Sequence, residues 1–318
     1  MASCLVTGGQ GFIGSALARA LLERGDRVAV LDLPEPPFEG LEAQGIAGEV
    51  ELFEGDLADP GEVTRAIEGQ ERVFHLGAVT LVGPAAADPV ATYRTNVEGT
   101  WTLLEGLRST AIEALVVASS DKAYGPSAEL PYREVQPLRP GSPYEGSKAA
   151  CDEVARSYGA IAGIPVAVTR LANVYGGGDL NFSRLVPELL AAVVNDRPPR
   201  IRSDGSPERD FLHVSDALEG YLAMADLVAG GSGHGEAFNL GTGTAVAVGR
   251  VIEVVDHLSV GKLRPVIEEE EGAAGEIDRQ FVDSTKVRGA TGWQATVDLE
   301  EGLEETLGWY TERPALCP

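Results

Sequence analysis

The chain has 318 residues, enough for one large domain or two closely packed ones. Its 49 acidic and 25 basic residues give a formal net charge of −24, which argues against nucleic acid or an anionic membrane as a partner. No apolar run is long enough to span a membrane, no basic segment precedes the first apolar run, and the three cysteines suggest no obvious pairing. We therefore expect a cytoplasmic protein without a signal peptide.

The first predicted strand, residues 4–7, leads into a glycine-rich turn and an amphipathic segment over residues 15–24. At a strand-to-helix turn, the pattern Gly-x-x-Gly-x-x-Gly lets the backbone approach a pyrophosphate closely, and the helix N-terminus supplies aligned N–H donors. The turn therefore predicts a dinucleotide site, and the cofactor contacts expected there are Gly8, Gly11, Phe12, Ile13 and Gly14.

A second strand, residues 27–32, ends in Asp32, about 20 residues beyond the glycines, where a carboxylate would meet a ribose 2′-hydroxyl. Leu33 follows instead of an arginine, so a 2′-phosphate would meet no cation and the pattern favours NAD over NADP. A third strand over residues 50–53 is followed by Asp56 and Leu57, which are suited to contact the adenine. Asp56 is equally well placed to cap a helix ahead of Pro60.

A fourth strand is predicted over residues 73–78, where small residues permit close approach of the cofactor. Leu76 and Ala78 are predicted cofactor contacts, whereas His75 is expected to be a packed core residue rather than a catalyst. Asp88 and Pro89 then have the form of a helix cap and first helical residue. The long helix that they open runs towards Arg108 and carries Asn96, another predicted cofactor contact.

The catalytic residues are predicted from two stretches. The first is Ser120-Asp121-Lys122, which follows an apolar strand over residues 114–118 and so emerges at its carboxyl end. The second is a helix in which Ser142 is the N-cap, Pro143 the first residue and Glu145 the return arm of a capping box.

Tyr144 and Lys148 are four residues apart and share one face of that helix. A phenol ionises only near pH ~10 in water, but a nearby ammonium and the positive end of a helix both favour its anion. Only four lysines occur in the chain and two of them fall in these stretches, which weakens the alternative of an ordinary surface Tyr and Lys.

A sixth strand, residues 165–170, completes an alternation of strands and helices. This alternation predicts an α/β fold, a doubly wound Rossmann-type sheet of mainly parallel strands, with ligands beyond the carboxyl ends of the strands. We predict an NAD-binding domain over residues 1–173, with roughly residues 205–245 interwoven, and a smaller substrate-binding lobe mainly over residues 174–318.

Beyond residue 173 we predict a loop at 176–179, helices over 182–194 and 248–258 and from residue 216, a strand over 237–241 and a terminal helix over 299–310. Arg200, Arg202 and Arg209 form the densest cationic cluster in this acidic chain. Guanidinium groups bind phosphate in a bidentate fork, so Arg209 first and then Arg200 are candidates to hold a diphosphate, whereas surface salt bridging is preferred for Arg202. The four glutamates at 268–271 are expected to be a solvated loop, and no metal site is predicted.

Together these motifs resemble the extended short-chain dehydrogenases/reductases of the NAD-dependent epimerase/dehydratase family, which act on nucleotide sugars. The resemblance extends over nearly the whole chain, with Gly77 at a position where an alanine is more usual. It rests on Thr7-Gly8-x-x-Gly11-x-x-Gly14, Asp32, Gly55-Asp56-Leu57, His75-Leu76-Gly77-Ala78, Asn96-Val97-x-Gly99-Thr100, Tyr144-x-x-x-Lys148, Arg209-Asp210-Phe211 and Asn239-Leu240-Gly241.

Within that family, Ser120-Asp121-Lys122 is similar to CDP-glucose 4,6-dehydratase and its relatives, whereas dehydratases of deoxythymidine-diphosphate glucose carry Thr-Asp-Glu there. Ala273 stands where epimerases often have an arginine, so one usual phosphate contact is absent. The resemblance implies substrate contacts at Thr80, Asn173, Arg184, Leu185, Arg200, Arg209 and Glu276.

The activity that the resemblance implies is loss of water across C5 and C6 of an NDP-hexose. Tyr144 would take the 4-hydroxyl proton, Ser120 would orient that oxygen, and Lys148 would hold the phenolate and the nicotinamide ribose. Asp121, protonated, would serve the departing 6-hydroxyl, while Lys122 could be the base at C5, steer a proton through water or stabilise the enolate.

Three alternatives stay open: an NDP-sugar 4- or 3,5-epimerase, less readily a uronic-acid decarboxylase, and more remotely a non-catalytic NAD-binding regulator. The resemblance also implies a homodimer built on the helices that begin near Asp88 and Pro143.

Overall fold

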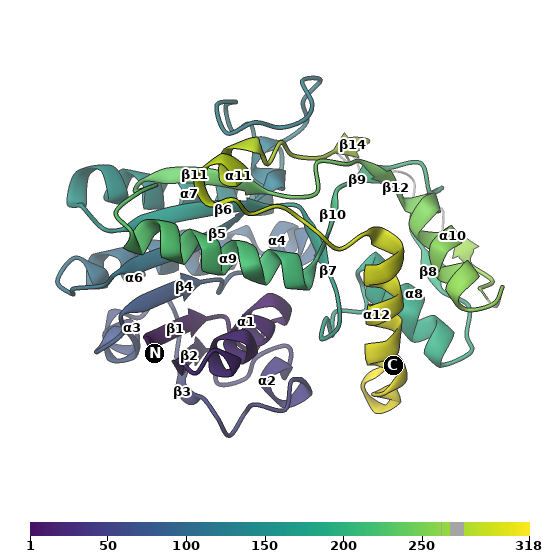
Figure 1. Cartoon of the computed structure of the whole chain (residues 1–318), viewed down its shortest axis with the longest axis horizontal. Coiled ribbons are helices and arrows are strands. Elements are labelled where there is room, and N and C mark those ends of the chain that lie inside the picture. The colour runs from purple at the N-terminus through teal and green to yellow at the C-terminus, as the bar shows by residue number, and fades with distance from the viewer. Residues whose placement is uncertain (262, 268–276) are drawn as a thin grey trace.

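The computed structural model describes residues 1–261, 263–267 and 277–318 (Figure 1). Its centre is a seven-stranded sheet in the order β11-β6-β5-β4-β1-β2-β3, and every neighbouring pair is parallel. This arrangement confirms the predicted Rossmann-type sheet. The strands are β1 Ser3–Thr7, β2 Arg27–Asp32, β3 Glu51–Glu54, β4 Arg72–His75, β5 Ala114–Ser120, β6 Val166–Leu171 and β11 Glu236–Leu240.

Helices cover both faces of the sheet, as its alternating side chains require. Val6 and Val116 belong to the core on one face, whereas their neighbours Leu5 and Val117 belong to the core on the other. The helices on the first face are α1 Phe12–Glu23, α9 Val214–Ala229 and α11 Thr285–Thr291. Those on the second are α3 Pro60–Ile67, α6 Gly99–Leu107 and α7 Pro143–Ala162.

The helical segment predicted from Asp88 is confirmed, but it has three parts. A side-chain oxygen of Asp88 accepts the N–H of Ala91 at 2.9 Å and caps α5 Pro89–Tyr93. A π-helical turn, η1 Arg94–Glu98, joins α5 to α6 and contains Asn96. Three short α-helices were not predicted: α2 Gly40–Ala43, α4 Val82–Ala87 and α11 Thr285–Thr291.

A smaller lobe packs beside the carboxyl edge of the sheet, around α8 Leu185–Val194, α10 Val248–Leu258 and α12 Leu299–Thr311. In Figure 1, α12 stands next to α8, and α10 lies on the outer side of the lobe. The short strands are β7 Asn173–Tyr175, β8 Arg200–Ile201, β9 Glu208–Arg209, β10 Phe211–His213, β12 Val246–Ala247, β13 Val266–Ile267 and β14 Arg279–Gln280. Because α9 and β11 return to the large sheet, the chain passes between the two lobes more than once (Figure 1).

Several element boundaries differ from the sequence-based predictions. The helix predicted from residue 182 begins at Leu185, since the side chains of Asp179 and Asn181 accept the N–H groups of Asn181 and Ser183 and hold the preceding segment in turns. The fourth strand ends at His75, and residues 76–80 leave the sheet at its carboxyl edge. In the described ranges, no helix combines the length and apolar character needed to cross a membrane.

Candidate cofactor and catalytic site

The glycine turn, residues 8–14, lies between the end of β1 and the start of α1. Gly8 has a φ of +71°, and a Cβ atom there would lie 2.6 Å from the Cα of Gly77. A Cβ on Gly14 would lie 2.1 Å from the carbonyl oxygen of Gly8. Side chains are therefore excluded where the turn folds back on itself, and the bare backbone with the N-terminus of α1 fits the pyrophosphate of a dinucleotide. Phe12 and Ile13 open that helix.

Asp32 ends β2 directly beside this turn. One carboxylate oxygen accepts the N–H of Gln10 at 2.7 Å and the other accepts the N–H of Leu33 at 2.8 Å. Burial raises the pKa of Asp32, and the two N–H groups oppose that rise. The backbone thus fixes the carboxylate while leaving each oxygen a further lone pair, an arrangement that suits a ribose diol.

Asp56 does not cap the following helix, so that alternative is wrong. Asp59 is the N-cap of α3, and its side chain accepts the N–H groups of Gly61 and Glu62 at 2.8 and 3.0 Å. Asp56 instead pairs with Arg94 at 3.0 Å. It remains partly exposed at the strand edge, and its role towards the adenine stays a prediction.

The side chain of Leu57 fills the space beside Gly77, so that a larger residue does not fit at position 77 without a shift. Its Cδ1 atom lies 2.6 Å from where a Cβ of Gly77 would be, and its Cβ lies 2.8 Å from where a Cβ of Gly99 would be. Leu57 is buried, and Leu76 and Ala78 are partly buried in the segment that leaves β4. An alanine at 77 would require the leucine to shift.

Asn96 is only 1% exposed, and its side-chain amide forms hydrogen bonds within the protein. The amide oxygen accepts the N–H of Val79 at 2.7 Å, and the amide nitrogen donates to the carbonyl of Val79 and the hydroxyl of Ser147. Since both N–H groups are occupied, the contacts of Asn96 join the segment after β4 to α7. Ser147 was not among the predicted site residues, because only the fold brings it to residue 96.

His75 is a core residue, as expected. Thr7 Oγ1 accepts the N–H of Gly77 at 3.1 Å and lies 2.8 Å from His75 Nδ1, to which it donates because the other ring nitrogen carries the proton. On the other side Thr100 Oγ1 donates to the carbonyl of Asn96 at 2.6 Å, so it accepts from His75 Nε2 at 2.9 Å. Burial lowers the pKa of His75 to about 3, with a smaller contribution from the Lys148 charge, and the ring is a neutral Nε2–H tautomer.

The turn η2, Asp121–Tyr124, directly follows β5. Asp121 is 1% exposed; Ser120 donates to its Oδ1 at 3.2 Å, and its Oδ2 is buried without a hydrogen-bond partner among the described residues. Burial raises the pKa of Asp121 to about 6, against the opposing charge of Lys122. Burial also lowers the pKa of the Lys122 amine, which the Asp121 carboxylate opposes and the charge of Arg209 reinforces. Burial therefore favours the neutral form of both side chains.

The helix α7 begins as predicted. The hydroxyl of Ser142 accepts the N–H of Glu145 at 3.3 Å, and Pro143 is the first helical residue. The carboxylate of Glu145 accepts the N–H of Gly141 at 2.6 Å, so the return arm of the box reaches one residue further back than expected.

Tyr144 and Lys148 are both buried, and this corrects one expectation. Burial raises the pKa of Tyr144 to about 12, although the hydroxyl of Ser120 acts in the opposite direction. The Lys148 ammonium donates to the carbonyl of Ala118 at 2.9 Å, and burial lowers its pKa. Burial therefore disfavours the Tyr144 phenolate near neutral pH, because desolvation outweighs the opposing hydrogen bond with Ser120.

Two arginines from the smaller lobe approach this turn. Arg209, in β9, acts electrostatically on both Asp121 and Lys122. Arg184 acts on Lys122 and Tyr144; it pairs with Asp179 at 2.8 Å, and its guanidinium lies 6.0 Å from the centre of the Phe12 ring. The smaller lobe thus brings positive charge over the glycine turn and the catalytic turn together.

The other predicted substrate residues are distributed more widely. The side-chain amide nitrogen of Asn173 is buried without a partner among the described residues, and Leu185 opens α8. Thr80 is exposed, and Arg200 is exposed in β8, which packs beside α8. Glu276 and the glutamates at 268–271 lie outside the described residues.

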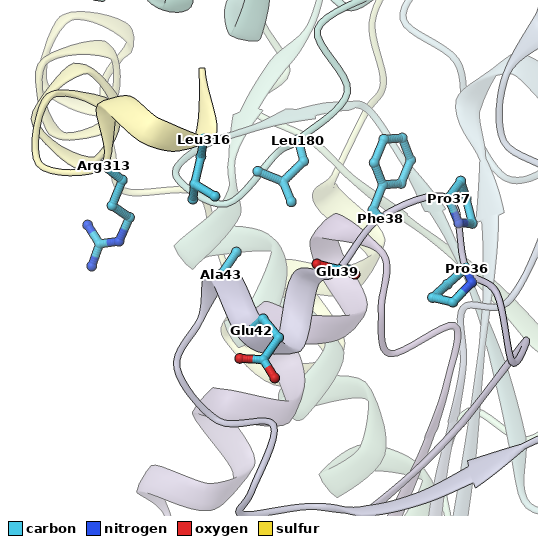
Figure 2. Close-up of a pocket in the computed structure, with 9 residues that line it drawn as sticks. All are labelled: Pro36, Pro37, Phe38, Glu39, Glu42, Ala43, Leu180, Arg313 and Leu316. Atoms are coloured by element: carbon cyan, nitrogen blue, oxygen red, sulfur yellow. The ribbon is translucent and has the colours of Figure 1, made fainter. Parts of the chain in front are cut away.

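A pocket of about 590 Å³ opens at a different place, between the segment after β2 and the C-terminus. In Figure 2 the side chains of Phe38, Leu180 and Leu316 lie in a row above Ala43. It is lined by Pro36, Pro37, Phe38, Glu39, Glu42, Ala43, Leu180, Arg313 and Leu316. No predicted catalytic or cofactor residue is among them.

Comparisons with known proteins agree with this geometry. A model of the NAD dependent epimerase/dehydratase family matches residues 4–241. The dTDP-glucose 4,6-dehydratase of Streptomyces griseus is 33% identical over 323 residues, covering 96% of this chain and 93% of that protein. The crystal structure of UDP-glucose 4-epimerase from Thermotoga maritima with UDP-glucose matches with a TM-score of 0.89 and 27% identity, covering 98% of this chain and 99% of that one.

A third match is the dTDP-glucose 4,6-dehydratase of Streptomyces venezuelae, solved with NAD bound, with a TM-score of 0.87, 29% identity and 98% coverage of both chains. The family is NAD-dependent, so the predicted cofactor is confirmed. The relatives are divided between two named activities, 4,6-dehydratase and 4-epimerase. The chain belongs to the NAD-dependent epimerase/dehydratase family, and its matched relatives are nucleotide-sugar dehydratases and epimerases.

Proposed function

We propose that the protein is an NDP-hexose 4,6-dehydratase, which converts its substrate to an NDP-4-keto-6-deoxyhexose. The observation that carries this proposal is the pair Asp121–Lys122. Burial holds the pKa of the carboxyl up at about 6 and lowers that of the amine. Oxidation at C4 needs one proton acceptor, the proposed role of Tyr144, so an additional acid and base in this turn support a second proton transfer.

The first chemical step needs a proton acceptor at the 4-hydroxyl. Tyr144 would accept that proton, Ser120 would orient the oxygen, and Lys148 would help to hold the phenolate. A bound NAD would supply the hydride acceptor at C4 and the hydride donor at C6, and its positive charge would favour the phenolate that burial alone disfavours. The glycine turn, Asp32, and the neighbouring residues 56–57 and 76–78 are the proposed cofactor contacts.

The second step removes water from C5 and C6. Oxidation of C4 acidifies the C5 hydrogen, Lys122 as the neutral amine would take that proton, and Asp121 would give its own proton to the departing 6-hydroxyl. Hydride return to C6 and protonation of C5 complete the product with no net oxidation. The lowered pKa of Lys122 favours the base over the other roles considered for it, steering a proton through water or stabilising an enolate.

The proposed substrate contacts come mainly from the smaller lobe. Arg209 and Arg184 bring positive charge to the catalytic turn, and the amide nitrogen of Asn173 is a buried donor that has no partner in the part of the chain that the structure describes. These groups fit a diphosphate and a sugar hydroxyl. Thr80, Leu185, Arg200 and Glu276 stay proposed contacts on the resemblance alone.

The alternative is a 4- or 3,5-epimerase, which the match to the Thermotoga maritima enzyme favours. An epimerase must let the keto sugar turn over or invert its ring carbons, and it needs no acid aimed at C6. The two activities give different products from the same oxidised sugar, so product identity decides between them.

The experiment combines the purified protein and NAD with hexoses linked to cytidine, uridine, thymidine or guanosine diphosphate. A dehydratase yields a 4-keto-6-deoxy sugar, detected by its absorbance in alkali and by mass. Asp121→Asn should still oxidise C4, seen as reduced cofactor, while losing water elimination. Asp59→Asn, which keeps a capping side chain on α3, should behave as wild type. Full turnover by Asp121→Asn would remove Asp121 from the acid role.

Lys122 is tested by two substitutions. Lys122→Glu keeps a base at the position where related dehydratases carry glutamate, so it should retain measurable elimination, whereas Lys122→Met should lose it. If both variants lose it equally, a positive charge on Lys122 is what matters and the base role is wrong.

We further propose that the enzyme is a cytoplasmic homodimer. Val90 in α5 and Trp101 in α6 are 80% and 54% exposed, and α7 lies alongside, since the Tyr158 hydroxyl donates to Glu105. Apolar side chains exposed on neighbouring helices fit a surface that a second copy covers. Sedimentation should give a dimer that Trp101→Glu weakens; a monomeric wild type would contradict it.

A further inference from the structure

A buried network lies directly behind the catalytic turn. Arg170, in β6, is 1% exposed, and its guanidinium donates to the two carboxylate oxygens of Asp152 at 2.7 and 2.9 Å. Its remaining nitrogen, Nη1, donates to the Tyr124 hydroxyl at 2.9 Å, and the guanidinium lies 4.9 Å from the centre of the Tyr124 ring. One side chain thus links an acid on α7 to an aromatic ring in η2.

Tyr124 is held on every side. Its hydroxyl donates to the side-chain oxygen of Asn239 at 2.7 Å while accepting from Arg170. Its ring stacks on Tyr132 with centres 4.7 Å apart and planes at 18°. Tyr124 is the last residue of η2, which begins with Asp121, so these contacts fix one end of the turn that carries the proposed acid and base.

Asp152 attaches the Arg170 guanidinium to α7. It lies on α7 four residues after Lys148 and eight after Tyr144, so the three side chains follow one another along the helix. Arg170 itself pairs in register with Ser119 on the neighbouring strand β5. The guanidinium therefore links α7, which carries Tyr144 and Lys148, to η2, which carries Asp121 and Lys122.

We propose that Arg170 is a positioning residue that sets the catalytic turn relative to α7. Its planar fork holds both oxygens of a carboxylate and donates a third bond to a phenol, in a fixed geometry that a lysine ammonium does not provide. A buried ion pair is weak evidence for stability, because apolar replacements of similar volume are often as stable. Orientation of Asp121 and Lys122 over the substrate is a role that such a replacement would lose.

This inference rests on the proposed dehydratase activity, and its effect on catalysis should be selective. Misplacing the turn impairs water elimination, which uses Asp121 and Lys122, more than oxidation at C4, which uses Tyr144. A displacement of about 1 Å can reduce a rate by on the order of 100-fold. Reduced cofactor should therefore accumulate in variants of the network.

The test uses Tyr124→Phe, Arg170→Lys and the double variant Arg170→Met/Asp152→Leu, which leaves no buried charge unpaired. Tyr158→Phe is the matched control, since it also removes a phenol hydrogen bond, on the outer part of α7. In the folded variants kcat for keto-sugar formation should fall about 10- to 100-fold with KM nearly unchanged. Amide hydrogen exchange of residues 121–125 should also become faster, whereas the control should match wild type in both measurements.

The two readouts separate the possible failures. A wild-type protein that forms only an epimer refutes the proposed dehydratase, while hydrogen exchange still reports whether Arg170 holds the turn. Lower melting temperatures with unchanged kcat per folded molecule would leave the network a structural role alone and overturn the positioning proposal. Unchanged exchange at residues 121–125 would overturn it as well.

Discussion

Two clusters of ionisable side chains, both largely buried, share the turn η2. The catalytic cluster consists of Asp121, Lys122, Tyr144 and Lys148, and the arginine cluster of Arg170, Asp152 and Tyr124. In the catalytic cluster burial dominates, so the pKa values of the acids rise and those of the amines fall. In the arginine cluster burial of Arg170 is overcome by the Asp152 carboxylate, and its pKa rises further above its usual value.

The two clusters are both buried, but they differ in the hydrogen-bond and ion-pair partners of their charged groups. The guanidinium of Arg170 donates to both carboxylate oxygens of Asp152 through Nε and Nη2 and to the Tyr124 hydroxyl through Nη1, whereas one oxygen of Asp121 has no partner among the described residues. Burial with a complete set of partners fixes a charge, and burial without them leaves a proton that can move. The fold thus places a rigid charged support directly against a group of proton donors and acceptors.

Removing one partner from the arginine cluster should have the largest effect on stability. Asp152→Ala leaves the Arg170 guanidinium buried without its carboxylate, which should lower the free energy of unfolding by about 3–5 kcal/mol. Urea denaturation measures this loss. Glu23→Ala removes an exposed partner of Arg19 and should change stability little. A similar small change for both variants would show that the buried pair is not complete in solution.

The pH dependence of stability tests the catalytic cluster. The pKa of Asp121 is raised from 3.8 to about 6, so the folded state holds this proton more tightly than the unfolded state. Its stabilising contribution is fully present below about pH 3.8 and is lost as pH rises through about 6. Asp121→Asn removes this loss, so the variant should gain on the order of 3 kcal/mol relative to wild type between about pH 4 and pH 7.

Asp283→Asn is a control in which the stability should change with pH in the opposite direction. The Thr285 hydroxyl and N–H lower the pKa of Asp283, so its contribution is present at neutral pH and is lost as pH falls. The asparagine variant should therefore lose stability relative to wild type as pH rises. Parallel pH profiles for the two variants would contradict the contrast between Asp283, whose carboxylate accepts hydrogen bonds from Thr285, and Asp121, whose Oδ2 has no partner among the described residues.

Local signals in the sequence predicted much of this fold. Strand-like apolar runs, the glycine turn and the Ser142-Pro143 cap each act over a few residues, and the structure confirms them. Asp59 could have been recognised as the cap of α3, because it directly precedes Pro60. The two-residue strands, such as β9 between β12 and β14, were missed because tertiary pairing alone defines them.

The parts of the site that the sequence did not predict depend on burial and on distant partners. The pKa of Tyr144 is raised mainly by burial, and the four-residue spacing to Lys148 in the sequence does not show how deeply Tyr144 is buried. Arg170 and Asp152 are 18 residues apart and meet across a strand and a helix. A charged residue inside the apolar strand over residues 165–170 was the one available signal that Arg170 must have a buried partner.

His75 differs from both clusters. It is a buried titratable group whose two ring nitrogens both have hydrogen-bond partners, but it is neutral. Thr100→Val should leave the Nε2–H of His75 without an acceptor and cost about 1–3 kcal/mol. Thr64→Val, at an exposed hydroxyl, is the control. Because burial lowers the pKa of His75 to about 3, nitrogen NMR should show a neutral Nε2–H ring throughout the range from pH 7 to pH 5. A protonated ring at pH 5 would contradict the hydrogen-bond chain.

The smallest effect is expected at Ser142, whose helix carries members of both clusters. Ser142→Ala removes the acceptor for the N–H of Glu145 and should cost about 1 kcal/mol of unfolding free energy. Ser142→Asp keeps an acceptor and adds a negative charge near the helix N-terminus, so it should retain wild-type stability. Since the cap lies outside both clusters, the loss in Ser142→Ala should be the same at pH 4 and pH 7. A loss that varies with pH would mean that the start of α7 also controls the environment of Asp121.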